Sequence, residues 1–239
     1  MRISWSLVKS VFLLGVVVFL YAFSSHKNNS RPIKGLEVQF TGKENVFITS
    51  EMVDKLLIQS HEELYFIEKD AIDLKEMEFV LTSNAMVKSA QVYLTVSGEV
   101  RAKVEQKTPI ARVYLDAVFY IDEDGFKMPL SSEYSARVPL VFGIEEEEDL
   151  KSIYKVALQI YKDAFLKTHI TEIVQKENKE ISLKMRMVDF EVLIGNLENL
   201  EEKLNNLKAF YQKAKKDNML DIYKSVNLQF NNQVVCTKK

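Results

Sequence analysis

The sequence predicts an α+β fold in which an N-terminal apolar helix precedes a small α/β module and a mixed β-sheet domain with flanking helices. Three observations support this prediction. Val11–Phe23 is an uncharged apolar run. The chain up to Gln106 then shows the order strand, helix, helix, strand, strand. From Lys107 onward, short runs typical of strands are interspersed with two longer segments of helical periodicity.

The apolar run is a candidate membrane span. A spanning helix needs about 20 apolar residues. Counting back to Ile3, with the Lys9 side chain reaching toward the interface, brings the run close to that length. We therefore expect a short tail over residues 1–9, a transmembrane helix over residues 10–25 and a linker over residues 26–32.

A cleaved signal peptide is the competing interpretation of the same segment. Arg2 and Lys9 give it a basic start, and Ala22-Phe23-Ser24 resembles a small-x-small cleavage site. The rule that positive charge stays inside does not decide the orientation, because basic residues also follow the run: His26, Lys27, Arg31 and Lys34. Both interpretations remain open on physical grounds alone.

Residues 33–106 are expected to form the small module. Leu36, Val38 and Phe40 alternate as in a half-buried strand. A first helix is expected to be capped by Thr49 or Ser50, and a second to start near Asp70 or Asp73. Two strands with alternating apolar residues are expected, one before and one after the turn at Ser97-Gly98. This order buries a three-stranded sheet against two helices, as in a POTRA module.

Residues 107–235 are expected to form the larger, β-rich domain, followed by a tail over residues 236–239. Strands are predicted over residues 110–115, 117–121, 170–175, 181–187, 190–194 and 222–237, where Asn231-Asn232 is a possible turn or bulge. One amphipathic helix is predicted over residues 149–169, and a second is expected to be capped near Asn196.

Two charged runs have two interpretations each. Glu145–Asp149 lies just before a predicted helix, where negative charge is favourable, and Lys213, Lys215 and Lys216 lie near the end of the next. We favour this structural explanation for both runs. The alternatives are an acidic docking patch and a basic patch for a partner.

No pattern in the sequence points to catalysis, a cofactor or a metal. The three histidines lie in separate segments, and the single cysteine, Cys236, has no base nearby in sequence. Asp122–Gly125 resembles part of a calcium loop but lacks the downstream glutamate, so a turn is favoured. The net charge of −2 gives no reason to expect nucleic acid binding. We expect no catalytic, cofactor-binding or metal-ligating residue.

The order of several short motifs resembles the FtsQ/DivIB family of bacterial cell-division proteins. The motifs are Asn84–Val92, Val104–Gln106, Pro109–Arg112, Tyr120–Asp122 with Gly125, Met128–Leu130 and Val138–Gly143. The resemblance covers most of the chain after the first apolar segment, and it is carried by the order and spacing of the motifs.

This resemblance implies a bitopic scaffold of the divisome that links FtsB/FtsL-like division proteins at the septum and helps control septal wall synthesis. It also implies an uncleaved anchor in the lipid bilayer of the inner membrane, with a cytoplasmic N-terminus and the bulk of the chain outside. The alternatives are a soluble periplasmic protein or another POTRA-bearing assembly factor and, least favoured, an enzyme.

We expect the partner to add a strand to the last strand of the sheet, interpreted as an open edge over Tyr223–Phe230. The family resemblance implies the same location. The expected partner-binding residues are Tyr223, Ser225, Asn227, Gln229, Phe230, Val234 and Val235. In this interpretation Asn231-Asn232 caps the paired region.

Overall fold

A computed structural model describes residues 5–29, 33–42, 47–60, 72–230 and 233–239. The expected helix start at Asp70 and the expected cap at Asn231-Asn232 lie outside these ranges. Internal contacts divide the chain into two units. Unit 1 contains the described residues through Gln106 except Phe47, and unit 2 contains Lys107–Lys239 together with Phe47. Phe47 was expected in the small module over residues 33–106, but its ring packs against aromatic side chains of unit 2.

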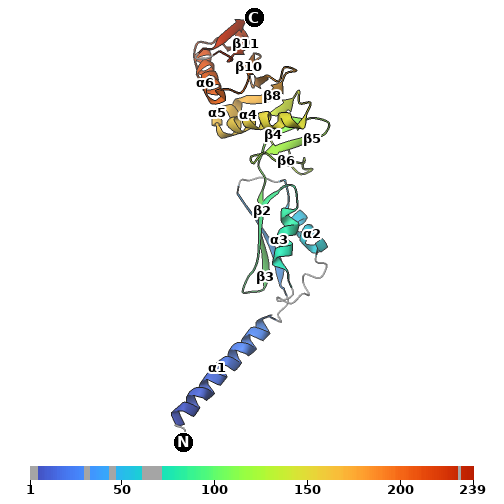
Figure 1. Ribbon diagram of the computed structural model, residues 1–239, viewed down its shortest axis with the longest axis vertical. Coiled ribbons are helices and arrows are strands. Elements are labelled where there is room, and N and C mark those ends of the chain that lie inside the picture. Colours follow the sequence, from blue (N-terminus) through green and yellow to red (C-terminus); the bar gives the residue numbers. More distant parts are fainter. Residues whose placement is uncertain (1–4, 30–32, 43–46, 61–71, 231–232) are drawn as a thin grey trace. The chain divides into compact units, whose positions relative to one another are not determined.

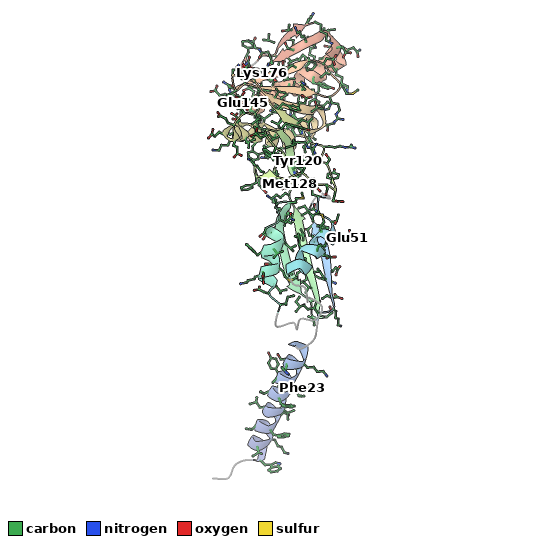
Figure 2. All side chains as sticks on the ribbon, turned by 90° about the vertical axis from the view of Figure 1, so that its right-hand side faces the viewer. Phe23, Glu51, Tyr120, Met128, Glu145 and Lys176 are labelled. Atoms are coloured by element: carbon green, nitrogen blue, oxygen red, sulfur yellow. The ribbon has the colours of Figure 1, made fainter. Side chains whose placement is uncertain are left out.

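Helix α1, Trp5–Asn29, contains one candidate membrane span, Val8–Lys27, with a mean hydropathy of 1.9 and no buried part. Figure 2 shows its side chains, including Phe23, as sticks around the helix. The helix continues past residue 25 into the segment expected to be a linker. It can do so because neither glycine nor proline, the two strong helix breakers, occurs from Val16 to Arg31.

Unit 1 contains the predicted order of strand, helix, helix, strand and strand (Figure 1). The elements are β1 (Gly35–Thr41), α2 (Ser50–Ser60), α3 (Leu74–Thr82), β2 (Val87–Leu94) and β3 (Glu99–Gln106). The sheet order is β1-β3-β2, with β1 parallel and β2 antiparallel to β3. The predicted cap at Asp73 is confirmed, because its Oδ1 accepts from the backbone N–H groups of Lys75 and Glu76, both at 3.0 Å.

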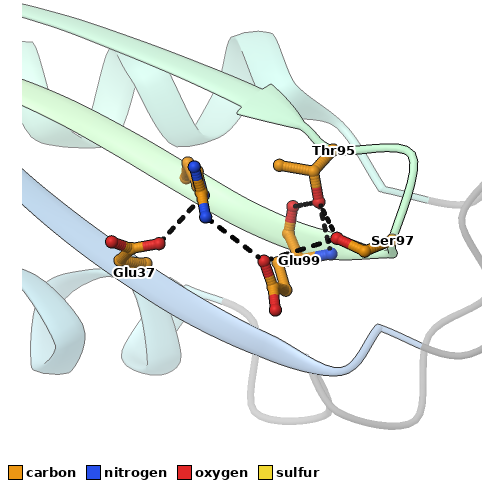
Figure 3. A network of polar contacts seen from close by, with 5 residues as sticks. Glu37, Thr95, Ser97 and Glu99 are labelled. Atoms are coloured by element: carbon orange, nitrogen blue, oxygen red, sulfur yellow. Dashed lines mark hydrogen bonds and ion pairs between the residues drawn. The ribbon is translucent and has the colours of Figure 1, made fainter.

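The two faces of the unit 1 sheet differ in character. One face packs against α2 and α3 through a buried core of Val53, Leu57, Met77, Leu81, Val92, Val100, Ala102 and Val104. The other carries charge: Arg101 Nε lies 2.9 Å from Glu37 and Arg101 Nη2 lies 3.5 Å from Glu99 (Figure 3). These ion pairs are half-exposed, so each contributes at most about 1 kcal/mol.

Unit 2 is built on a nine-stranded sheet with the order β12-β11-β10-β9-β8-β7-β4-β5-β6. Its strands are β4 (Pro109–Tyr114), β5 (Val118–Asp122), β6 (Lys127–Met128), β7 (Leu140–Phe142), β8 (Ile170–Gln175), β9 (Ile181–Met185), β10 (Glu191–Gly195), β11 (Tyr223–Asn227) and β12 (Val235–Lys238). Its helices are α4 (Leu150–Lys162), α5 (Ala164–His169) and α6 (Leu200–Lys216), with short 3-10 turns η2 (Glu147–Asp149) and η3 (Leu220–Ile222).

One row of side chains crosses most of this sheet and forms the core with the helices. The register aligns Val113, Val141, Ile173, Leu183, Val192, Val226 and Cys236 on neighbouring strands. The same core cluster includes Ile153 and Ile160 of α4 and Leu204 and Leu207 of α6. The alternation of apolar residues along each strand therefore fixes which face of the sheet receives the helices.

Two helix boundaries differ from the predictions. The helix expected over residues 149–169 breaks at Asp163, which is extended (φ −108°, ψ 119°) and caps α5 by accepting from Leu166 N. Helix α6 begins at Leu200 rather than near Asn196. The backbone and side-chain oxygens of Asn196 instead accept hydrogen bonds from Lys203.

Two carboxylates of the acidic run Glu145–Asp149 make contacts within unit 2. Glu147 pairs with Lys127, and Asp149 Oδ2 lies 2.8 Å from Lys179 Nζ. The hydrogen bond from Lys179, helped by one from Gln175, lowers the pKa of Asp149. The first contact connects η2 to β6 and the second connects it to the β8–β9 turn, which agrees with the structural interpretation of these two charges.

Candidate partner-binding edge of the second unit

Strand β12 is the end strand of the nine-stranded sheet. Among the residues that the structure describes, it pairs only with β11, in antiparallel orientation. The backbone N–H of Lys239 points toward β11, because it donates to the carbonyl of Ile222, directly before β11, at 2.9 Å. Backbone groups alternate in direction along a strand, so Lys238 and Cys236 direct their N–H and C=O groups away from β11. These two residues form the open edge, where a further strand can pair.

The expectation that Tyr223–Phe230 forms this open edge is wrong. β11 lies between β10 and β12: Ser225 is in register with Glu191 and Thr237, and Asn227 with Leu193 and Val235. The backbone of β11 is therefore already paired on both sides. The expectation of a C-terminal tail over residues 236–239 is also wrong, because Cys236–Lys238 belong to β12.

Gln229 and Phe230 lie beyond the end of β11. Gln229 N donates to the side chain of Asn227 at 2.8 Å, and its amide Nε2 donates to Glu180 Oε1 at 3.0 Å. Gln229 thus holds the segment after β11 and does not belong to the ladder. The Phe230 side chain is half-exposed.

A groove of about 510 Å³ joins α6 to the edge strand. Its wall is mainly apolar and is made by Ala209, Phe210, Ala214, Met219, Tyr223, Val234 and Cys236. The Phe210 ring packs edge-on against Tyr223, with centroids 5.3 Å apart. The structure thus brings three of the expected site residues, Tyr223, Val234 and Val235, to the groove or to β12 itself.

Charge at this edge is carried mainly by lysines. Lys224 on β11 and Lys238 on β12 are exposed, and Lys213 pairs with Asp217 at the groove at 3.1 Å. The Cys236 thiol is half-buried, and burial raises its pKa, so it stays neutral at pH 7 and acts as part of the apolar wall. Within the described ranges, no group of side chains with metal-ligating character occurs. The arrangement is suited to binding an extended polypeptide segment.

Sequence reasoning missed Cys236, Lys238 and Phe210. A strand of only four residues that ends in lysines is easily mistaken for a solvated tail. The available signal was the alternation of Val234, Cys236 and Lys238 with Val235 and Thr237. Phe210 could have been found as an apolar residue one position before Tyr211 on a helix that borders the last strands.

The comparisons with known proteins agree with this architecture. A family model described as FtsQ/DivIB, C-terminal related, matches residues 108–237, and a model of a POTRA-like domain matches residues 34–105. A search of curated proteins gave no match. A POTRA-like module, a larger mixed sheet with an open edge and one apolar N-terminal helix define a modular protein of the single-pass membrane class.

The chain belongs to the FtsQ/DivIB, C-terminal related, family, since that model covers more than half of its length. The earlier resemblance to FtsQ/DivIB is therefore confirmed, as is the predicted fold class. Members of this family are non-catalytic division proteins, and membership indicates a cell division protein.

Proposed function

We propose that this protein is a bitopic scaffold of the bacterial divisome. It links FtsB/FtsL-like membrane-anchored division proteins at the septum and helps control septal wall synthesis. It lies in the inner membrane with its N-terminus in the cytoplasm and its two units outside. The open edge of β12, next to an apolar groove, is the observation that best supports a binding role.

Strand addition to β12 is the proposed mode of partner binding. The backbone groups of Cys236 and Lys238 supply hydrogen bonds to the incoming strand, and these bonds provide affinity without regard to side chains. Specificity then comes from side chains on alternating faces of the added strand. A residue opposite Cys236 faces the groove lined by Phe210 and Val234, so an apolar side chain is favoured there.

Exposed lysines restrict the choice of partner further. Lys224 and Lys238 give the edge a positive character that attracts acidic segments and repels basic ones. Edge lysines also prevent uncontrolled pairing between copies of this chain, because bringing two such edges together places like charges side by side.

The test is to replace Lys238 by proline. Proline removes the outward N–H group, and its ring obstructs an incoming strand, while the pairing of β12 with β11 uses other residues. Tagged wild-type and variant chains are purified from cells, and co-purified FtsB- and FtsL-like proteins are quantified by mass spectrometry. We expect at least about tenfold lower recovery with Lys238→Pro.

Lys238→Ala is the matched control, because it removes the same side chain but keeps the N–H group. It should recover the partners nearly as well as the wild type. Circular dichroism of both variants checks that unit 2 stays folded. Full recovery of the partners by folded Lys238→Pro would contradict strand addition at β12.

A further inference from the structure

Unit 2 contains an aromatic slot that is filled by a side chain from far upstream in the sequence. The Phe47 side chain is fully buried there. Its ring centroid lies 5.2 Å from that of Tyr134 and 6.1 Å from that of Tyr120, in edge-to-face arrangements. The backbone carbonyl of Phe47 accepts a hydrogen bond from Ser131 Oγ at 2.8 Å.

The walls of the slot are held by contacts that do not involve Phe47. The hydroxyl of Tyr120, labelled in Figure 2, accepts from Arg112 Nη2 at 2.8 Å and from Ala136 N at 3.1 Å. Arg112 also donates to Ser135 Oγ at 3.1 Å. Ser135 and Ala136 follow Tyr134 in the chain. Their hydrogen bonds attach the segment that carries Ser131 and Tyr134 to β4 and β5. The slot is consequently pre-organised for its occupant.

Proteins can recognise a short peptide segment through two kinds of contact. One is a buried aromatic side chain of the segment, and the other is a hydrogen bond to the segment's main chain. An aromatic side chain in a desolvated pocket provides most of the binding free energy, and the backbone bond fixes its orientation. The slot has both features, namely the buried ring of Phe47 and the hydrogen bond to its backbone carbonyl.

We propose that the Tyr120–Ser131–Tyr134 slot is a recognition site for a phenylalanine on a short peptide segment, and that Phe47 is its ligand within this chain. The site is separate from the proposed β12 edge, because β5 and β12 lie toward opposite ends of the strand order. A partner that carries such a segment competes with Phe47 for the slot.

The test uses the full-length chain in detergent with Phe47→Ala, which empties the slot. The probe is a fluorescent peptide with the sequence of residues 42–50, Gly-Lys-Glu-Asn-Val-Phe-Ile-Thr-Ser, and binding is followed by fluorescence anisotropy. The peptide should bind the variant at least about tenfold more tightly than the wild type, where tethered Phe47 competes at an effective concentration of the order of millimolar. A peptide with alanine in place of phenylalanine should bind at least about tenfold more weakly.

Two second-site changes in the Phe47→Ala chain locate the binding. Tyr134→Ala removes a wall of the slot and should abolish the gain in affinity. Tyr114→Ala is the matched control, because Tyr114 is exposed to a similar extent and stacks on Phe142 instead; it should leave binding unchanged. Equal effects of the two changes, or no binding to Phe47→Ala, would overturn the proposal.

Loss of Phe47 also removes buried surface, so the variant is checked by circular dichroism. If unit 2 is partly unfolded, the peptide should restore its spectrum and raise its Tm, because a ligand that binds only the folded state stabilises it by mass action. Absence of any such restoration would equally overturn the proposal, since Phe47 would then be an ordinary core residue.

Discussion

A buried ammonium group fixes the start of α6. Lys203 Nζ donates to Ile194 O at 3.0 Å and to the backbone and side-chain oxygens of Asn196 at 2.8 and 3.0 Å. Burial lowers the pKa of Lys203, because the charged form has lost most of its water. Three oxygen acceptors replace that water and connect the end of β10 to the first turn of the helix.

Asp163 is a second residue with a local structural role, and it predicts a pH dependence. Its carboxylate accepts from Lys208 Nζ at 2.6 Å and caps α5 by accepting from Leu166 N. The hydrogen bond from Lys208, followed by that from Leu166, lowers its pKa. The stabilisation is therefore present above the unfolded-state pKa of about 3.9 and is lost as pH falls through the lower folded-state value.

Asp163→Asn tests this, because it removes the charge while keeping a side chain that can cap. At pH 7 we expect a loss of about 0.5–2 kcal/mol in the free energy of unfolding, measured with urea. The difference from the wild type should stay constant down to about pH 4 and shrink below it. A difference that persists undiminished to about pH 2 would show that the charge of Asp163 is not the cause.

At the scale of the element, α3 illustrates how one buried face supports unit 1. Leu81 is fully buried, whereas Phe79 on the same helix is 70% exposed. Leu81→Ala should lower the stability of unit 1 by about 2–5 kcal/mol, because it leaves a cavity. Phe79→Ala, the matched control, should change it by at most about 0.5 kcal/mol.

Limited proteolysis of the Leu81→Ala chain measures where the damage lies. Cleavage should become faster within unit 1, while a resistant fragment that begins near Lys107 persists. This outcome requires that the two units unfold separately. Simultaneous loss of protection in both units would mean that they form one cooperative system, whatever their internal contacts.

Periodicity made most elements predictable but not their ends. The alternation of Val100, Ala102 and Val104 locates β3, and the spacing of Leu74, Met77 and Leu81 locates α3, because one buried face dictates each pattern. The break at Asp163 was hidden, since the apolar spacing continues across it. Only the extended backbone and the cap reveal it.

The candidate site was harder to predict, because its open edge is defined by strand order and not by local pattern. Sequence placed the edge at the end of the sheet but assigned it to β11. Which strand is outermost depends on the pairing of Tyr223–Asn227 with both Glu191–Leu193 and Val235–Lys238. Pairings of this kind link residues that are distant in sequence or separated by a turn, so periodicity alone does not fix them.

At the scale of the whole molecule, each part has a distinct composition that suits a distinct environment. Helix α1 is apolar and unburied along its candidate span. Unit 1 combines a small core with a charged sheet face, and unit 2 contains a larger core with an open strand edge. A protein built in this way is expected to be anchored through α1 and to offer unit 2 to partners.

Retention of α1 in the mature protein is the prediction that separates a bitopic scaffold from a soluble periplasmic protein. The run Val11–Phe23 carries no charge, and Arg2 and Lys9 precede it. An uncleaved span should keep the chain in the membrane pellet after alkaline extraction, and only detergent should release it. Mass spectrometry of the native protein should accordingly detect peptides from within α1. A new N-terminus at or near Ser25, together with release of the shortened chain into the periplasmic fluid, would identify the segment as a signal peptide and contradict the anchored scaffold.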